Sequence, residues 1–376
     1  MFSTNQEIHK LQYQFLVSIG LILILGVVMV YSSSYIYAKD VFGGANYLLY
    51  RQLIFACLGI GISYVVSKTK IKFWINYGHY INYITVLFIL LTLIPGLGIN
   101  VKGAHRWVSF FGFSFQPGEL LKYSIILSSI SIFESFNDLT QKERLIRVSS
   151  IILPMILLII QPDFGTFSIC SLVIFFICYL SSFDRKKFYI LTGVGTVTLI
   201  SVMLMAPYRV ERLLSYLDPW ENPKTSGFQI IQSYLAFANG SLFGQGLGNS
   251  NEKLFYLPEA HNDFIFSVIG EELGFSGVFL TVVLFIGFIY FGLKICSLMS
   301  ERKHGILVAA ITFVIGLQAL LNMGVVLGLL PTKGLNLPFI SYGGSSLVSN
   351  LFGIGLILST LKSIKTRNSP YLSTET

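Results

Sequence analysis

The sequence predicts an all-α fold, namely a polytopic membrane protein of about ten transmembrane helices with one large structured extracytoplasmic loop. Hydrophobic residues make up 53% of the chain and charged residues only 12%, with a mean hydropathy of +0.71. Soluble domains carry about 25% charged residues. The apolar residues also fall into long uncharged runs, and basic residues gather in alternate connections between these runs.

Ten stretches approach the roughly 20 apolar residues that a helix needs to cross about 30 Å of hydrocarbon. They lie near residues 15–35, 47–66, 75–96, 117–136, 148–162, 164–181, 188–206, 262–291, 305–329 and 339–361. The fifth and sixth are short and share the turn QPDFG at 161–165. They form either two separate spans, which we favour, or one re-entrant pair.

Clusters of basic residues mark one side of the membrane. They are Lys68, Lys70 and Lys72; Lys142, Arg144 and Arg147; Arg185, Lys186 and Lys187; Arg302 and Lys303; and Lys362, Lys365 and Arg367. The positive-inside rule makes these segments cytoplasmic, and an even number of spans then places both termini in the cytoplasm. Residues 36–46, 97–116, 207–260 and 330–338 face outward. Because topology accounts for the net charge of +8, we predict no nucleic-acid partner.

We expect a single domain, residues 1–376, because no shift in composition and no repeat of fixed period divides the chain. Its cytoplasmic tails would be residues 1–14 and 362–376. The loop at 207–260 is rich in apolar residues, which predicts folded structure. Its segment 228–238 (FQIIQSYLAFA) has an apolar stripe that suits a helix at the membrane interface or against the bundle. All four cysteines lie in or beside predicted spans, so we expect no extracellular disulfide framework.

The large loop closes on LPEAHNDFIF, residues 257–266, where Asp263 stands at the point of entry into hydrocarbon. A carboxylate there is costly, and such residues usually find a partner or mark a site. Glu259 and His261 lie within the same five residues. A helix that begins near Pro258 would place Glu259 and Asp263 one turn apart. The pattern fits a functional acid and a helix cap equally well.

Several outward basic residues are not explained by the positive-inside rule. Lys102 and Arg106 precede Trp107 in the second outer loop, Lys253 follows a glycine-rich segment, and Lys333 lies between two prolines. Such cations suit an anionic headgroup such as a pyrophosphate. The alternatives are solvated loop charges and, for Trp107, an aromatic belt at the interface.

Two further patterns have simpler interpretations. The glycine-rich segment GSLFGQGLGNS, residues 240–250, lacks the strand and helix of a nucleotide-binding fingerprint, so we interpret it as a turn that allows close approach of the backbone. Glu119 and Lys122 are three residues apart within a predicted span, which predicts a structural ion pair.

In this order, the segments of the chain resemble the SEDS family of polytopic bacterial proteins for shape, elongation, division and sporulation. The similarity covers about residues 15–361, and PTKG, LPFISYGGSS and LPEAHND resemble the division branch more than the elongation branch. The matching segments are KGAHRW (102–107), QPGELLK (116–122), QPDFGT (161–166), GFQIIQS (227–233), GQGLGNS (244–250), LPEAHNDFIF (257–266), GEELG (270–274) and PTKGLNLPFISYGGSS (331–346).

The resemblance implies a peptidoglycan glycosyltransferase of the bacterial cytoplasmic membrane, which polymerises lipid II at the outer face for septal wall synthesis. It also implies a class B penicillin-binding protein as partner, together with other divisome or elongasome proteins, and a divalent cation such as Mg²⁺ or Mn²⁺. The sequence itself identifies no metal ligands. The family's essential aspartate, tryptophan and lysine fall on Asp263, Trp107 and Lys333. Further candidate substrate contacts are Lys102, Arg106, Lys253, Glu259, His261 and Ser341.

In this interpretation Asp263 is the general base for the attacking sugar hydroxyl. An α-linked donor that gives a β-linked product implies inversion, which needs a single displacement and no second carboxylate nucleophile. Three alternatives remain: an elongation-branch polymerase, a transporter that flips lipid-linked precursors, and a division scaffold without chemistry. For the transporter, the acids and the lysine within spans would line the path, namely Glu119, Lys122, Glu271 and Glu272.

Overall fold

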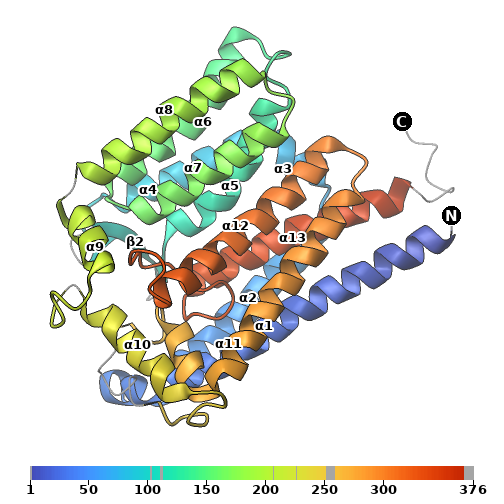
Figure 1. Cartoon of the computed structure of the whole chain (residues 1–376). Coiled ribbons are helices and arrows are strands. Elements are labelled where there is room, and N and C mark those ends of the chain that lie inside the picture. Colours follow the sequence, from blue (N-terminus) through green and yellow to red (C-terminus); the bar gives the residue numbers. More distant parts are fainter. Residues whose placement is uncertain are drawn as a thin grey trace.

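The computed structural model describes residues 2–101, 104–110, 113–205, 207–225, 227–250 and 259–367. Long helices run side by side, and shorter elements cover one end of them (Figure 1). The helices are α1 (Phe2–Phe42), α2 (Tyr47–Lys68), α3 (Ile71–Asn76), α4 (Gly78–Leu91), α5 (Pro117–Phe133), α6 (Gln141–Ile160), α7 (Phe164–Leu180), α8 (Arg185–Leu204), α9 (Pro207–Leu217), α10 (Phe228–Gly240), α11 (Ile265–Ser297), α12 (Arg302–Val326) and α13 (Gly344–Arg367).

Each of the ten predicted spans coincides with one long helix of the described residues, and the extra helices are the short α3, α9 and α10. Among the described residues, six helices are long and apolar enough to cross a membrane by length and composition, and α4 and α7 are shorter apolar helices. The turn at 161–163 separates α6 from α7, and both two spans and a re-entrant pair would show this separation. The chain is a multi-pass membrane protein.

Helix α12 is the centre of the bundle, and it packs against α5, α7, α11 and α13. Helices α2 and α13 pair along one side, α4 and α5 along another, and α1 lies along α11. The N-terminal end of α1 and the C-terminal end of α13 lie at the same end of the bundle (Figure 1), as an even number of spans requires.

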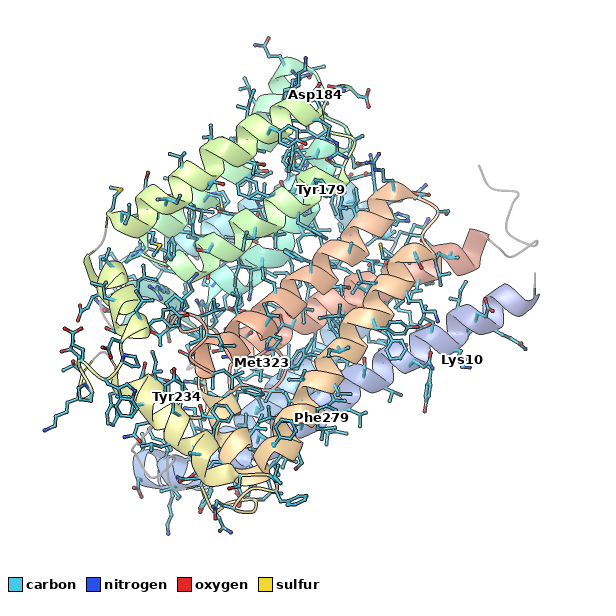
Figure 2. The ribbon with its side chains drawn as sticks, viewed as in Figure 1. Lys10, Tyr179, Asp184, Tyr234, Phe279 and Met323 are labelled. Atoms are coloured by element: carbon cyan, nitrogen blue, oxygen red, sulfur yellow. The ribbon has the colours of Figure 1, made fainter. Side chains whose placement is uncertain are left out.

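The two ends of the bundle differ in chemistry. Figure 2 shows Asp184, at the start of α8, and Tyr234, on α10, at opposite ends of the molecule. We call the end with Asp184 the basic face, because it carries the clusters of arginine and lysine. There Arg185 donates to the carbonyl of Tyr179, and Arg302 to that of Leu180, which pairs carbonyls at the end of α7. The other end, with α9, α10 and residues 259–264 and 327–343, is the site face.

The loop between α4 and α5, at the site face, contains the only strands among the described residues. Strands β1 (Gly98–Val101), β2 (Ala104–Phe110) and β3 (Phe113–Phe115) form an antiparallel sheet in the order β1-β2-β3. The sequence analysis predicted no strands here. Val101 pairs with Ala104 and Phe110 with Phe113, so each hairpin has a two-residue connection whose second residue is glycine. Two-residue connections that contain glycine are typical of β-hairpins, so the sequence carries a local signal for this sheet.

A buried ion pair confirms the prediction for α5. Lys122 Nζ lies 2.7 Å from Glu119 Oε2 and also donates to Gln318 Oε1 at 2.7 Å. Lys122 is 2% exposed and Glu119 9%. Burial weakens the screening of this pair and raises the cost of leaving either charge alone.

The glycine-rich segment 240–250 packs against a break in α11. Gly274 has φ +64°, and the helix is interrupted there. The N–H groups of Gln245 and Gly246 donate to the carbonyls of Glu271 and Glu272, at 2.9 and 3.0 Å. The segment therefore supplies hydrogen bonds that the broken helix lacks, in agreement with its interpretation as a close-approach turn.

The ion pair predicts a large loss of stability when one partner is removed. Lys122→Met leaves the Glu119 carboxylate buried without its cation, and we expect a loss of about 3–5 kcal/mol. The double variant Glu119→Leu/Lys122→Met removes the stranded charge and should recover most of that loss. Thermal unfolding in detergent measures both, and a single variant as stable as the parent would contradict the prediction.

Candidate active site

Asp263 lies in the short segment 259–264 that leads into α11. Helix α11 begins at Ile265, with Phe264 as its N-cap residue and no side-chain capping bond, so the cap interpretation of Asp263 is wrong. Residues 259–264 form turns, and the predicted helical spacing of Glu259 and Asp263 does not occur. Asp263 therefore takes no part in capping α11.

The Asp263 carboxylate points to the loop that carries Lys333. Its Oδ2 lies 3.2 Å from the position that a Cβ would take on Gly334. Gly334 has φ +55°, a conformation that favours glycine. A larger residue at this position would press on the carboxylate, so Gly334 lets the acid approach the backbone beside Lys333.

Ser341 joins these two parts of the site face. Its Oγ donates to the carbonyl of Asn262 at 2.7 Å and accepts from the N–H of Leu337 at 2.7 Å. The N–H of Tyr342 donates to the carbonyl of His261 at 2.9 Å. Ser341 is 4% exposed. Its predicted role as a substrate contact therefore changes, because its hydroxyl faces inward and positions the backbone.

His261 and Glu259 support the turn around Asp263. The ring of His261 lies between those of Tyr37 and Tyr342, with centroids 5.0 and 5.9 Å away. Burial lowers the pKa of His261, and the nearby Glu259 partly opposes this shift. Glu259 accepts a hydrogen bond from Asn262 Nδ2. Both residues are half-buried.

Two cations of the site face, Arg106 and Lys333, lie at the turn between α6 and α7. Arg106 donates through Nη2 to the carbonyl of Pro162. Its Nε is buried and has no hydrogen-bond partner among the described residues. Lys333 Nζ lies 5.3 Å from the ring centroid of Phe164, and burial lowers its pKa. The spare Arg106 donor and the Lys333 ammonium therefore flank one turn, which suits an anionic group.

Trp107 follows Arg106 in β2, where it pairs with Ile99 of β1 and is half-buried. The sheet thus holds the tryptophan next to the cation, as the order of the residues predicts. Lys102 and Lys253, the other two predicted cationic contacts, lie outside the described residues.

Asp163 is a residue that sequence reasoning missed. It is the N-cap residue of α7 and accepts hydrogen bonds from the N–H of Thr166 at 3.2 Å and from its Oγ1 at 2.9 Å. Gln116 Nε2 donates to it at 3.5 Å. Asp163 therefore fixes the turn that Arg106 and Lys333 contact. The signal was an Asp directly before an apolar run.

The donor set fits a divalent cation only in part. Among the described residues, no three His, Cys, Asp or Glu side chains form a group that could hold a metal ion. Mg²⁺ is commonly bound by one or two carboxylates together with phosphate oxygens of a substrate. A cation held by Asp263 would therefore need the substrate to complete its coordination.

The fold and the site define a polytopic membrane protein whose acid and cations gather at one end of the bundle. A family model described as "Cell cycle protein", which covers FtsW, RodA and SpoVE, matches residues 12–366. The chain belongs to this family, and the resemblance to the SEDS proteins is confirmed.

Curated relatives named "Probable peptidoglycan glycosyltransferase FtsW" align along most of the chain. The protein from Geobacter sulfurreducens is 40% identical over 350 residues, which are 90% of this chain and 92% of the relative. The protein from Coxiella burnetii is 38% identical over 347 residues, with coverage of 90% and 92%. These similarities confirm the prediction that the chain lies close to the division branch.

Solved structures share the fold. A chain from the structure described as "Structural coordination of polymerization and crosslinking by a peptidoglycan synthase complex" superposes with a TM-score of 0.73 at 26% identity, over 93% of this chain and 97% of that one. The rod shape determining protein RodA of Thermus thermophilus gives a TM-score of 0.67 at 22% identity, over 93% and 96%. The second match supports the fold alone.

The burial of His261 predicts acid sensitivity of the turn around Asp263. Because the folded pKa is lowered, the unfolded segment takes up a proton at a higher pH than the folded one. The turn should be fully stable above about pH 6.5 and lose stability as the pH falls below that value. Histidine NMR measures the pKa directly. Tyr37→Ala exposes the ring and should raise the pKa, whereas equal values in parent and variant would contradict the prediction.

Proposed function

We propose that this chain is a peptidoglycan glycosyltransferase that polymerises lipid II for septal wall synthesis. The single observation that carries the proposal is the Asp263 carboxylate placed against Gly334, next to the Lys333 cation. The names of the curated relatives support it. A polymerase of lipid-linked sugars needs an acid that accepts a proton and cations that stabilise a leaving pyrophosphate, and the site face offers both.

The reaction is a single displacement. Asp263 takes the proton from a sugar hydroxyl of the acceptor, and that oxygen forms a bond to the anomeric carbon of the donor. The bond from this carbon to the pyrophosphate oxygen breaks, and its electron pair leaves with undecaprenyl pyrophosphate. Attack opposite to the leaving group inverts the anomeric configuration, so one carboxylate suffices.

Lys333 and Arg106 would act on the leaving group. Negative charge grows on the pyrophosphate as the bond breaks, and both cations contact the turn at 162–164. The half-buried position of Lys333 strengthens its electrostatic effect, because fewer water molecules screen it. A divalent cation shared by Asp263 and the phosphate oxygens would add further charge stabilisation, and the displacement described here does not depend on it.

We further propose that the site face is the outer face and that both termini are cytoplasmic. The basic face carries the clusters that the positive-inside rule assigns to the cytoplasm. In this orientation Asp263 and the cations meet lipid II after its sugar has crossed the membrane. The lipid tails would lie along the bundle while the sugars remain at the site face.

A class B penicillin-binding protein is the partner that we propose for crosslinking. The similar solved chain comes from a complex described as coordinating polymerisation and crosslinking. A polymerase that exports uncrosslinked glycan needs a transpeptidase at the same membrane face. The site described above contains glycosyl-transfer groups and no assigned transpeptidase nucleophile, so the second activity is assigned to the partner.

Replacement of Asp263 tests the chemistry. Purified Asp263→Asn protein, reconstituted with lipid II and the transpeptidase partner, should form glycan about 10²–10⁴ times more slowly, because general-base help has this magnitude. The matched control is Asp218→Asn, an exposed acid of the same face whose contact is to the N–H of Trp220. Polymerisation by Asp263→Asn at the parental rate would refute the assignment.

The same reconstitution in vesicles separates the functions of other classes. A glycan polymer supports the polymerase, while movement of labelled lipid II across the bilayer without polymer would support the transporter. Neither polymer nor movement, with the partner present, would favour the scaffold.

The lowered pKa of Lys333 predicts an alkaline limb for donor use. The ammonium binds pyrophosphate and the free amine does not, so KM for lipid II should rise as the pH approaches this pKa, which lies below about 10.4. Lys333→Arg keeps its charge and should flatten the limb, whereas Lys333→Ala should raise KM at every pH. Lys224→Arg, an exposed lysine of the same face, is the control. An identical limb in the parent and Lys333→Arg would contradict the prediction.

A further inference from the structure

Asn322, near the end of α12, makes two hydrogen bonds with one nitrogen atom. Its Nδ2 donates to the carbonyl of Asp263 at 2.7 Å and to the carbonyl of Leu335 at 2.6 Å. The amide has two N–H groups, and each carbonyl takes one of them. The reverse orientation would place an amide oxygen against two carbonyl oxygens, so the contacts fix the amide.

These two carbonyls belong to the two segments that form the site. Asp263 is the proposed base, and Leu335 follows Lys333 by two residues. A single side chain therefore connects the backbone of the acid to the loop of the cation. Ser341 connects the same two segments through the carbonyl of Asn262, but it lies within the loop itself. Asn322 instead fastens both segments to the central helix of the bundle.

Gln318 extends this attachment one turn earlier on the same face of α12. Its Nε2 donates to the carbonyl of Asn336 at 3.1 Å, and its Oε1 accepts from Lys122 Nζ at 2.7 Å. The loop after Lys333 is thereby joined to the buried ion pair in α5. The two amides of α12 together hold three carbonyls of the site segments, namely those of Asp263, Leu335 and Asn336.

The position of Asn322 argues against a simple packing role. It is 2% exposed. Its Oδ1 is buried without a hydrogen-bond partner in the described part of the chain. An amide oxygen in this state is unfavourable, and a leucine, which has the same branching, would not carry that penalty. Unlike leucine, asparagine supplies two N–H donors for the carbonyls of Asp263 and Leu335.

We propose that Asn322 is a positioning residue for glycosyl transfer, which holds Asp263 and Lys333 at a fixed separation before the substrate arrives. The proposal rests on the proposed function, because it concerns the same base and cation. Catalysis by a positioned base depends steeply on geometry, and a misplacement of about 1 Å costs about 10²-fold in rate. Asn322 touches neither the carboxylate nor the ammonium in the structure, so it acts through their backbones.

Substitutions that remove the donors test the proposal. Asn322→Leu and Asn322→Asp keep the branching of the side chain and remove both N–H donors, and Asn322→Ser retains one hydroxyl donor. For the Leu and Asp variants we expect kcat for lipid II polymerisation to fall about 10²-fold, with KM within about twofold of the parent. The control is Thr312→Val, an isosteric change on α12 at a residue that is 1% exposed and whose hydroxyl has no hydrogen-bond partner among the described residues. It should keep parental kinetics.

Hydrogen exchange supplies a second measurement on the full chain in detergent. The N–H of Tyr342 is bonded across the two site segments, to the carbonyl of His261. The N–H of Leu337 is bonded to Ser341 Oγ, which itself donates across the segments to the carbonyl of Asn262. In Asn322→Leu both should exchange faster than in Thr312→Val, while α5 and α7 keep their protection. A role in global stability would instead accelerate exchange throughout the bundle.

Parental kcat in folded Asn322→Leu would overturn the proposal. A raised KM with unchanged kcat would also overturn it and would make Asn322 a substrate contact. Faster exchange throughout the bundle, or failure of all three variants to fold, would overturn it by showing that Asn322 serves global stability. A parent that makes no polymer would refute the proposed function instead. The exchange measurement would then still decide whether Asn322 holds the two segments together.

Discussion

The site depends on the pairing of backbone groups in segments that are not helical. Irregular backbone at the depth of a membrane bundle is tolerated only where protein groups pair its N–H and carbonyl groups. Segments 259–264 and 335–342 meet this requirement together, through Ser341, the N–H of Tyr342 and the amide of Asn322. The same bonds that satisfy the backbone also set where Asp263 and Lys333 lie. The same hydrogen bonds therefore stabilise the non-helical backbone and position the two reactive side chains.

The arginine and lysine residues perform different tasks at the two ends of the bundle. On the basic face, Arg185 and Arg302 donate to carbonyls at the end of α7, so their charge complements a helix terminus. On the site face, Arg106 uses one donor on the turn and keeps Nε without a partner among the described residues, while Lys333 lies over an aromatic ring. The first group stabilises the ends of helices, and the second remains able to receive an anion.

The sequence predicts those parts of this structure that depend on residues close to one another in the chain. Runs of apolar residues locate the ten long helices, and the i, i+3 spacing of Glu119 and Lys122 locates the ion pair. The entry of Asp263 into an apolar run also singles out that acid correctly as a residue of the site face. Arg106 and Lys333 were candidates because the positive-inside rule does not explain their predicted outward position, and the structure places both beside the turn between α6 and α7.

The remaining features depend on partners that are distant in the sequence. The inward orientation of Ser341 follows from the carbonyl of Asn262, and the importance of Asn322 follows from two carbonyls on different segments. These partners are not neighbours of Ser341 or Asn322 in the sequence, so local patterns do not reveal them. The sheet was predictable in principle from its two-residue connections. Of the two interpretations left open for Asp263, the helix cap does not occur, because the turns at 259–264 delay the start of α11.

The break at Gly274 divides α11 into two helical parts. The first part, residues 265–273, is fixed by α10 and by the glycine-rich segment, whereas the later part presents Phe275, Phe279 and Ile286 to the lipid side. A continuous helix would transmit any tilt of its lipid-facing length to its beginning, because its hydrogen bonds form an unbroken ladder. In α11 the glycine-rich segment bridges the interruption, because the carbonyls of Ser241 and Leu242 accept from the N–H groups of Phe275 and Ser276 beyond it. The acid at the head of the helix and its lipid-facing length are thus tied to one folded segment instead of to one continuous ladder.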